Sequence, residues 1–212
     1  MICPLRLVHY LTSDNNDETN AVRRTNMFQR MAVRIAGILC LLLATHMGTA
    51  MAADLENTLY LETKDGRVVI EMRPDLAPKH VARIKELARQ KFYDGLLFHR
   101  VIDGFMVQTG DPRGDGTGGS GQNLPPEFSS EKHVRGVVSM ARAASPASAD
   151  SQFFIMLGDS EWLDNKYSVW GKVTSGMEFV DQIKKGDQSK NGTVSNPDKI
   201  VTIRVAADVD GK

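Results

Sequence analysis

The stretch FHRVIDGFMVQTGD, residues 98–111, places one arginine and one glutamine among large apolar side chains. Its partial alternation predicts two β-strands, and a period of two puts Phe98, Arg100 and Ile102 on one face of the first strand. A buried cation is costly unless it is paired or put to use. The arginine therefore suggests a site where a guanidinium donates hydrogen bonds in apolar surroundings. The alternative is an ordinary hairpin with this arginine facing solvent.

Two segments further along the chain supply more side chains of the kind that line a pocket. SQFFIML contains Gln152 and Phe154. EWLDNKY, which is expected to be loop, contains Trp162, Leu163 and Tyr167. Each of these residues alone is more often part of a core than of a site. Together with the arginine they predict an apolar pocket with a few convergent polar groups, the common form of a ligand site.

Several other chemistries are not expected from this sequence. The three histidines beyond residue 60 are widely spaced, and the two cysteines, Cys3 and Cys40, lie far upstream of them. Without HExxH or CxxC patterns, neither a zinc site, thiol chemistry nor a disulfide framework is expected. No G-x-S-x-G elbow occurs. The glycine-rich stretch 114–122 lacks the Gly-Lys-Ser/Thr ending of a phosphate loop and on composition alone resembles a flexible surface loop. We expect no cofactor and no metal.

The charge balance gives no reason to expect a polyanionic partner. The chain of 212 residues has 26 basic and 26 acidic side chains, for a formal net charge of zero. A basic excess gathered on one face is the usual mark of nucleic-acid binding. We therefore expect no nucleic acid among its partners.

A secretory leader is predicted near the N-terminus. After Met27 come two arginines, a ten-residue apolar run over 35–44 and an Ala-x-Ala sequence ending at Ala52. That order predicts a signal peptide over 27–52, export to the periplasm, and a mature domain over 53–212. The alternative is a membrane anchor. Because the run is well short of the ~20 residues that a span requires, we expect no stable membrane insertion.

Residues 1–26 precede this leader and are polar, with no hydrophobic periodicity. A leader normally begins a protein, so we expect Met27 or Met31 to be the true start and 1–26 to be an upstream extension. If Met1 is the start, the low hydrophobicity of this extension predicts disorder.

The mature domain is predicted to be mostly β-structure. Alternating residues around a Lys-Asp-Gly turn predict a hairpin of 59–63 and 68–72. Further strands are expected over Phe98–Ile102, Met106–Thr109, Gly136–Ala141, Gln152–Leu157, Ser168–Thr174 and Lys199–Ala206. Helical spacing predicts two helices, over 78–90 and 176–185, and KGDQSKNGTVSNPD is expected to be turn-rich loop. Since eight strands without helical crossovers favour antiparallel pairing, we predict a mainly all-β fold, a closed eight-stranded antiparallel barrel capped by two α-helices.

These stretches resemble the cyclophilins, the cyclosporin-binding peptidyl-prolyl cis-trans isomerases. The resemblance covers nearly all of Asn57–Val205, with FHRVIDGFMVQTGD, GTGGSG, GVVSMA, SQFFI and WLDNKYSVWGKV in the family's order and spacing. Within the family the chain looks most like the secreted bacterial, periplasmic branch. The resemblance implies rotation about X-Pro bonds in exported proteins, proline-containing polypeptides as partners, cyclosporin as an inhibitor, and a monomer.

The resemblance also implies which residues form the site. Arg100 matches the catalytic arginine. The walls of the proline pocket match Phe105, Met106, Phe154 and Leu163. The polar groups that position the peptide and the arginine match Gln108 and Gln152.

Other positions match the parts of the site around the proline pocket. The strand edge for the substrate backbone matches Ala141 and Arg142, an arginine where many members have asparagine. The neighbouring side pocket matches Gly116, Thr117 and Gly118. The rim matches Trp162 and Tyr167, a tyrosine where many members have histidine, which puts one substrate hydrogen bond in doubt.

The hairpin geometry sets a condition on this assignment. A strict two-residue turn at Asp103 and Gly104 would pair Arg100 with Val107 and direct Gln108 to the opposite face. If Arg100 and Gln108 share a site, a longer loop or a bulge must lie between the strands.

Isomerisation breaks no covalent bond, so the absence of a nucleophile or metal motif is compatible with it. The rival functions are a proline-peptide adaptor with the same pocket and little turnover, and a purely structural barrel. A guanidinium can donate a hydrogen bond to the proline nitrogen mainly in the twisted transition state, which raises turnover rather than affinity. Arg100 together with the full set of wall residues therefore favours the enzyme.

Overall fold

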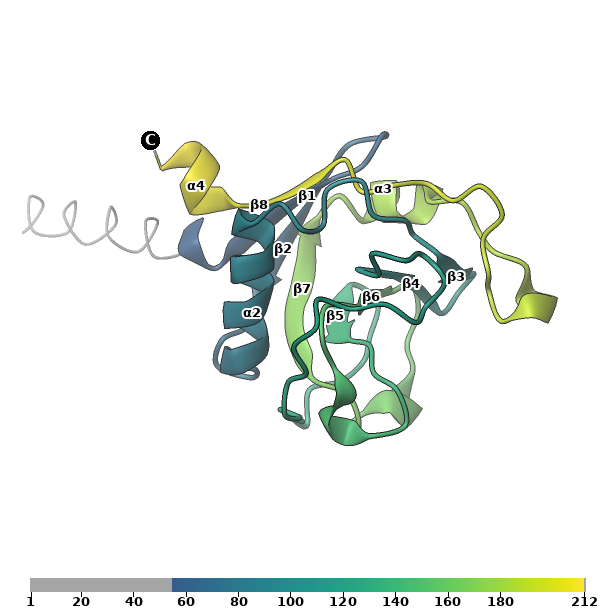
Figure 1. The fold of residues 1–212 in the computed structure, drawn as a ribbon, viewed down its shortest axis with the longest axis horizontal. Helices are drawn as coiled ribbons and strands as arrows, with labels where there is room; N and C mark the ends of the chain where they lie inside the picture. The colour runs from purple at the N-terminus through teal and green to yellow at the C-terminus, as the bar shows by residue number, and fades with distance from the viewer. Residues whose placement is uncertain (1–54, 212) are drawn as a thin grey trace, which may run out of the picture. The chain divides into compact units, whose positions relative to one another are not determined.

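The computed structural model describes residues 55–211, which form an eight-stranded antiparallel sheet with a few short helices (Figure 1). The strands are β1 (Thr58–Glu62), β2 (Arg67–Met72), β3 (Arg100–Ile102), β4 (Met106–Thr109), β5 (Val137–Met140), β6 (Phe153–Met156), β7 (Val169–Ser175) and β8 (Thr202–Val205). The helices are α2 (Pro78–Arg89), α3 (Met177–Gln182) and α4 (Ala206–Asp210), with 3₁₀ turns η1 (Pro146–Ser148), η2 (Glu161–Leu163) and η3 (Gln188–Lys190). The predicted extension 1–26 and leader 27–52 lie outside the described residues.

The eight strands and the two predicted helices are confirmed. The last strand, predicted over Lys199–Ala206, is shorter at both ends: Lys199 and Ile200 pair with the segment around Leu97, and the chain turns at Ala206 into α4. Ala206 is fully buried, and the helix is fixed to the rest of the fold by Asp208, which accepts hydrogen bonds from Arg89, and Asp210, which accepts one from Tyr60. The sequence ending Ala-Ala-Asp-Val-Asp-Gly carries this helix, which the alternation of the preceding strand obscured.

The sheet is a half-barrel and not the predicted closed barrel. Its strand order is β3-β4-β6-β5-β7-β2-β1-β8, and within residues 55–211 the two end strands form no ladder with each other. Near their starts they are joined only by the bridge between Leu97 and Lys199 and its flanking hydrogen bonds. The physical reason is that the loop 186–194 pairs with the outer edge of β3, where Val101 N–H donates to Gly192 O over 2.8 Å.

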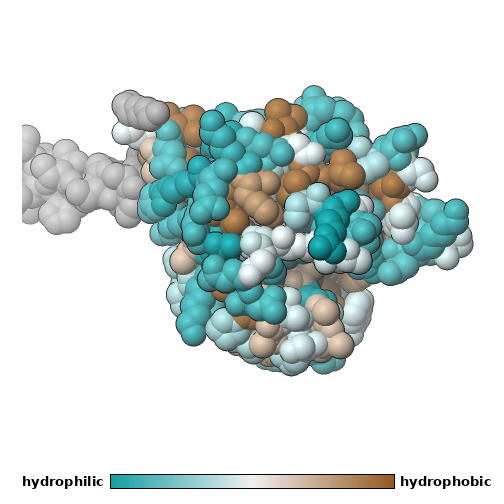
Figure 2. All heavy atoms as spheres, in the orientation of Figure 1, coloured by the Kyte–Doolittle hydropathy of each residue, from teal (hydrophilic) through white to brown (hydrophobic). Residues whose placement is uncertain are grey.

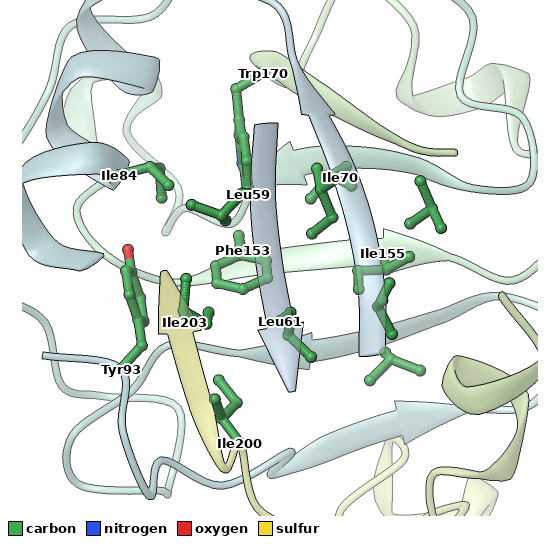
Figure 3. Packing of buried hydrophobic residues seen from close by; sticks show 14 of the residues in the cluster. Leu59, Leu61, Ile70, Ile84, Tyr93, Phe153, Ile155, Trp170, Ile200 and Ile203 are labelled. Atoms are coloured by element: carbon green, nitrogen blue, oxygen red, sulfur yellow. The ribbon is translucent and has the colours of Figure 1, made fainter. Parts of the chain in front are cut away.

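The larger hydrophobic core fills one side of the sheet (Figure 3). Leu59, Ile70, Phe153 and Trp170 are fully buried there, and Ile84 from helix α2 packs onto them. The helix begins with proline at its first turn, which suits a position whose N–H would have no helical partner. Its apolar residues recur three and four apart, so a single face of the helix is buried.

A second, smaller core lies on the other face of strands β4 and β6. Because side chains alternate along a strand, Phe153 and Ile155 join the larger core while Phe154 and Met156 join the smaller one. Met106 of the neighbouring strand β4 packs in the same smaller cluster. One face of these two strands therefore belongs to the larger core, and the opposite face carries the smaller one.

The surface of the described domain is mostly hydrophilic, with hydrophobic residues in small scattered groups on the face shown in Figure 2. Trp162 is the most exposed large hydrophobic residue of the described part, with 60% of its surface accessible. Among residues 55–211, no helix has the length and apolar character required to cross a bilayer.

Candidate active site

The hairpin of β3 and β4 brings Arg100 and Gln108 together. These two residues are direct partners in the ladder, and Ile102 is paired with Met106. Three residues, 103–105, therefore connect the strands, and the loop is closed by Phe105 N–H donating to Ile102 O over 3.0 Å. Gly104 has φ +70°, the left-handed conformation that such a loop needs. The expected longer loop is confirmed, and it is what lets both polar side chains face one site.

The site is a cavity of about 400 Å³ on the smaller core. Eleven of the predicted site residues line it: Arg100, Phe105, Met106, Gln108, Gly116, Ala141, Arg142, Phe154, Trp162, Leu163 and Tyr167. The other three, Thr117, Gly118 and Gln152, line an adjoining cavity of about 250 Å³ that shares several walls with the first. The structure therefore brings all of the predicted site residues into two neighbouring hollows.

The floor of the first cavity is apolar and rigid. Met106, Phe154 and Leu163 are almost completely buried, and Tyr167 meets Phe154 edge-on with ring centroids 5.6 Å apart. At the rim the ring of Phe105 lies 5.2 Å from that of Trp162. Such a surface favours a compact apolar ring, with an indole at the edge able to cover it.

The guanidinium of Arg100 lies at this cavity, and its hydrogen-bond acceptors are all neutral groups. Its Nη1 donates to Gln108 Oε1 over 3.0 Å, its Nη2 to Asn191 Oδ1 over 2.9 Å, and its Nε to Asn191 O over 3.0 Å. No ion pair joins it to a carboxylate within residues 55–211. Burial lowers the pKa of Arg100, but a guanidinium remains protonated in proteins. The cavity thus contains a cation whose charge is not neutralised.

A chain of side-chain amides links this guanidinium to the glycine-rich loop. Gln108 Nε2 donates to Gln152 Oε1 over 2.9 Å. Gln152 Nε2 in turn donates to Gly116 O over 3.0 Å and to Gly118 O over 2.8 Å. The two glutamines therefore connect the first cavity to the second and fix the direction of the arginine's acceptor.

The glycine-rich loop is held by two aspartates and is not the flexible surface loop that composition alone indicated. Asp111 accepts from the backbone N–H groups of Arg113, Asp115 and Gly116. Burial opposes ionisation of Asp111, but backbone N–H donors, among them those of Arg113 and Gly116, keep the pKa of its carboxyl below its usual range. Asp150 accepts from the three successive N–H groups of residues 120–122. The loop is a fixed wall between the two cavities.

Arg142, which stands where many cyclophilins have asparagine, is engaged by its own surroundings. Its Nε and Nη2 each donate to Lys166 O over 3.1 Å, and its Nη1 donates to Ala143 O over 2.9 Å. Its guanidinium carbon lies 4.7 Å from the centroid of the Tyr167 ring, a cation–π contact. The two departures from the common family pattern are therefore in direct contact with each other.

A buried histidine supports the floor from behind. His133 Nδ1 lies 3.0 Å from Asp164 Oδ1, and its Nε2 lies 3.0 Å from Ser139 Oγ. The ring stacks on Phe154 with centroids 6.4 Å apart. Burial lowers the pKa of His133, although Asp164 acts in the opposite direction. This contact joins strand β5 to the turn that carries Trp162.

Five lining residues were missed by sequence reasoning: His99, Gly114, Asp115, Asn191 and Thr193. The first three lie inside stretches described above: His99 in residues 98–111, and Gly114 and Asp115 at the start of the glycine-rich stretch 114–122. The last two lie in the segment that was interpreted only as turn-rich loop, and nothing in its pattern indicates that it returns to the arginine. The Asn-Gly pair at 191 and 192 predicts a tight turn, but it does not predict that this turn lies next to the arginine in space.

The comparisons with known proteins agree with this geometry. The family described as cyclophilin type peptidyl-prolyl cis-trans isomerase matches residues 58–205. A probable peptidyl-prolyl cis-trans isomerase of Brucella suis is 52% identical over 193 residues, which cover 85% of this chain and 98% of that protein. Peptidyl-prolyl cis-trans isomerase B of Bacillus subtilis is 43% identical over 136 residues, 63% of this chain and 94% of its own.

Solved structures show the same fold. A cyclophilin from Hirschia baltica has a TM-score of 0.66 at 29% identity, covering 74% of this chain and 76% of that one. A Cryptosporidium parvum cyclophilin-type isomerase, solved in the presence of the dipeptide Ala-Pro, has a TM-score of 0.64 at 28% identity and covers 70% and 98%.

The chain therefore belongs to the cyclophilin family, and it is a peptidyl-prolyl cis-trans isomerase of the cyclophilin type. Within residues 55–211 no three histidine, cysteine, aspartate or glutamate side chains gather as a metal site.

Proposed function

We propose that the first cavity binds the proline of an X-Pro segment and that Arg100 stabilises the twisted transition state. The observation that carries this proposal is a guanidinium held by three hydrogen bonds to neutral acceptors beside an apolar floor. The proline ring packs on Phe105, Met106, Phe154 and Leu163. The substrate backbone runs along Ala141 and Arg142 toward the second cavity, where Gly116, Thr117 and Gly118 flank the side chain of a neighbouring residue.

The chemistry follows from what rotation does to an amide. The X-Pro bond rotates over a barrier of ~20 kcal/mol, and at the twisted geometry amide resonance is lost. The carbonyl becomes less polar and the proline nitrogen gains a localised lone pair. An apolar floor then disfavours the planar, polar ground state, while a guanidinium N–H can bond to the lone pair mainly in the twisted state.

The size of the arginine effect can be bounded. A hydrogen bond from a charged donor is worth ~1.5–3 kcal/mol, and each ~1.4 kcal/mol changes a rate tenfold. Arg100 should therefore contribute about ten- to a hundredfold to turnover. The remaining acceleration has to come from the floor and from substrate positioning by Gln108 and Gln152.

The physiological substrates we propose are exported proteins that fold in the periplasm. Support comes from the order of residues 27–52, which is that of a secretory leader, while the similarity to known isomerases supports only the activity. We also propose that the enzyme acts as a monomer and that cyclosporin occupies the first cavity, with Trp162 at its edge.

The decisive experiment compares the wild type with Arg100→Ala in an isomer-exchange assay on a short X-Pro peptide. Turnover should fall at least tenfold, while peptide affinity and the far-ultraviolet spectrum stay close to those of the wild type. Arg100→Lys, which keeps the charge but not the planar fork, should recover only part of the loss. Equal turnover in wild type and Arg100→Ala would refute the role of the arginine and favour the peptide-adaptor alternative.

A further inference from the structure

The loop between Gly186 and Val194 makes most of the contacts that orient the Arg100 side chain. Two of the three hydrogen bonds from the guanidinium end on one residue, Asn191: its backbone oxygen accepts from Nε and its side-chain Oδ1 accepts from Nη2. Asn191 lies 91 positions further along the chain, so this contact depends on tertiary structure and not on the local hairpin.

The same loop is anchored on both chain neighbours of Arg100. Val101 donates to Gly192 O over 2.8 Å, and Gly186 N–H donates to Val101 O over 2.9 Å. Val194 N–H donates to His99 O over 3.1 Å. Because these bonds flank the arginine, the distance between its backbone and the tip of the loop is fixed.

The backbone of the tip is shaped to present both acceptors at once. Asn191 has φ +55°, in the left-handed region where asparagine is among the few tolerated residues. Gly192 follows with φ +78°, and a Cβ there would collide with the Ile102 side chain and approach the backbone of Val101. The sequence Asn-Gly thus meets a steric demand while aiming a carbonyl and an amide oxygen at one guanidinium.

Two of the N–H groups of the Arg100 guanidinium are left without an acceptor from Asn191 or Gln108. A guanidinium has five N–H groups in a rigid plane. Asn191 takes two and Gln108 takes one, so two remain, one on each terminal nitrogen. Since both acceptors are neutral amides, the charge on these two donors is not reduced by an ion pair.

We infer that Asn191 is a positioning residue for isomerisation: it holds the Arg100 guanidinium so that its two free N–H groups face the bound proline. The inference rests on the proposed role of Arg100. It predicts that changes at Asn191 act on turnover through the arginine and leave peptide affinity largely alone, because the proline pocket is built from other residues.

The test uses Asn191→Gly, which keeps the left-handed backbone and the carbonyl but removes Oδ1. Asn196→Gly is the matched control, because Asn196 lies just after this loop, has a left-handed φ of +52°, and is exposed and absent from the lining of both cavities. We expect kcat to fall about three- to tenfold in Asn191→Gly with KM nearly unchanged, and to stay at the wild-type value in the control.

A double-mutant cycle with Arg100→Ala isolates the path of the effect. If Asn191 acts through the arginine, Asn191→Gly should lower kcat in the wild-type background and should have no further effect once Arg100 is alanine. An equal loss in both backgrounds, or no loss in the first, would overturn the inference. Loss of activity in Arg100→Ala with full activity in Asn191→Gly would overturn the role of Asn191 alone, whereas full activity in both would overturn the role of the arginine as well.

Asn191→Asp provides an independent readout. An aspartate can hold the guanidinium in the same place, but it neutralises part of its charge. Turnover should then fall without loss of thermal stability. An aspartate variant as active as the wild type would contradict the requirement for a neutral acceptor.

Discussion

At the scale of single residues, the site is defined by polar side chains that are satisfied by neutral partners. Arg100, Gln108 and Gln152 form a continuous series of hydrogen bonds that ends on the backbone of the glycine-rich loop. A carboxylate in this series would bind the arginine more strongly but would also compete with the substrate for its charge. Neutral acceptors fix direction and leave the donor strength intact.

Trp162 gives the prediction that belongs to this scale. Its indole is 60% exposed and packs on the Phe105 ring at the cavity rim, so it offers an apolar face and one N–H donor to a bulky ligand. We expect cyclosporin to bind and inhibit, and Trp162→Phe to weaken that binding about tenfold or more while changing turnover much less.

Titration by tryptophan fluorescence, together with inhibition of the isomer-exchange assay, measures both effects. The other tryptophan, Trp170, is fully buried in the larger core, so a ligand-dependent change should report Trp162. Wild-type enzyme that ignores the drug far above the enzyme concentration would show that the rim has been misassigned. So would a Trp162→Phe protein that loses turnover as steeply as drug binding.

At the scale of elements, local pattern and distant pairing determined different parts of the fold. Strand β4 has the predicted bounds, Met106–Thr109. The open edge of the sheet could not be predicted, because strand β3 has only three residues and its outer partner is a loop near residue 190. The contact between Asn191 and Arg100 could not be predicted either, because the two residues are 91 positions apart and no local sequence pattern indicates such a contact.

The contact between strand β5 and turn η2 makes stability depend on pH. Burial lowers the pKa of His133 and of His99, so near pH 6 the unfolded chain binds more protons than the folded one. The free energy of unfolding should therefore fall as pH drops below about 6.5, the ordinary pKa of histidine, and level off once the folded-state pKa values are passed.

Urea denaturation at pH 7.5 and 5.5 measures this fall. In His133→Gln the difference between the two pH values should shrink, because one of the two groups responsible is gone, and the part due to His99 should remain. The comparison is between two pH values of one protein, so a general loss of stability in the variant does not affect it. An unchanged difference would mean that His133 does not titrate as its burial requires.

At the scale of the whole molecule, the half-barrel separates stability from function by its two faces. The larger core holds the sheet together with helix α2, whereas the smaller core, on the opposite face of β4 and β6, forms the floor of the cavity. The sequence predicts part of this division, since Phe154 was expected in the pocket, but it does not predict two separate cores. The loops that complete the site, at residues 111–122 and 186–194, were placed by the fold, through Asp111, Asp150 and the edge of β3.

The chain upstream of this domain carries the last prediction: in the exported form the protein begins at or close to Ala53. Cleavage after Ala52 would leave every ladder of the sheet intact, because strand β1 begins at Thr58 and pairs with β2 and β8 from there on. Intact-mass measurement and N-terminal sequencing of protein from the periplasmic fraction test this. Ala52→Leu, which removes a small residue from the Ala-x-Ala site, should retain the leader and shift the protein to the membrane fraction. A periplasmic protein that still begins at Met27 or earlier would show that the leader is not removed, and a wild-type protein found in the membrane fraction would show that residues 27–52 anchor the enzyme.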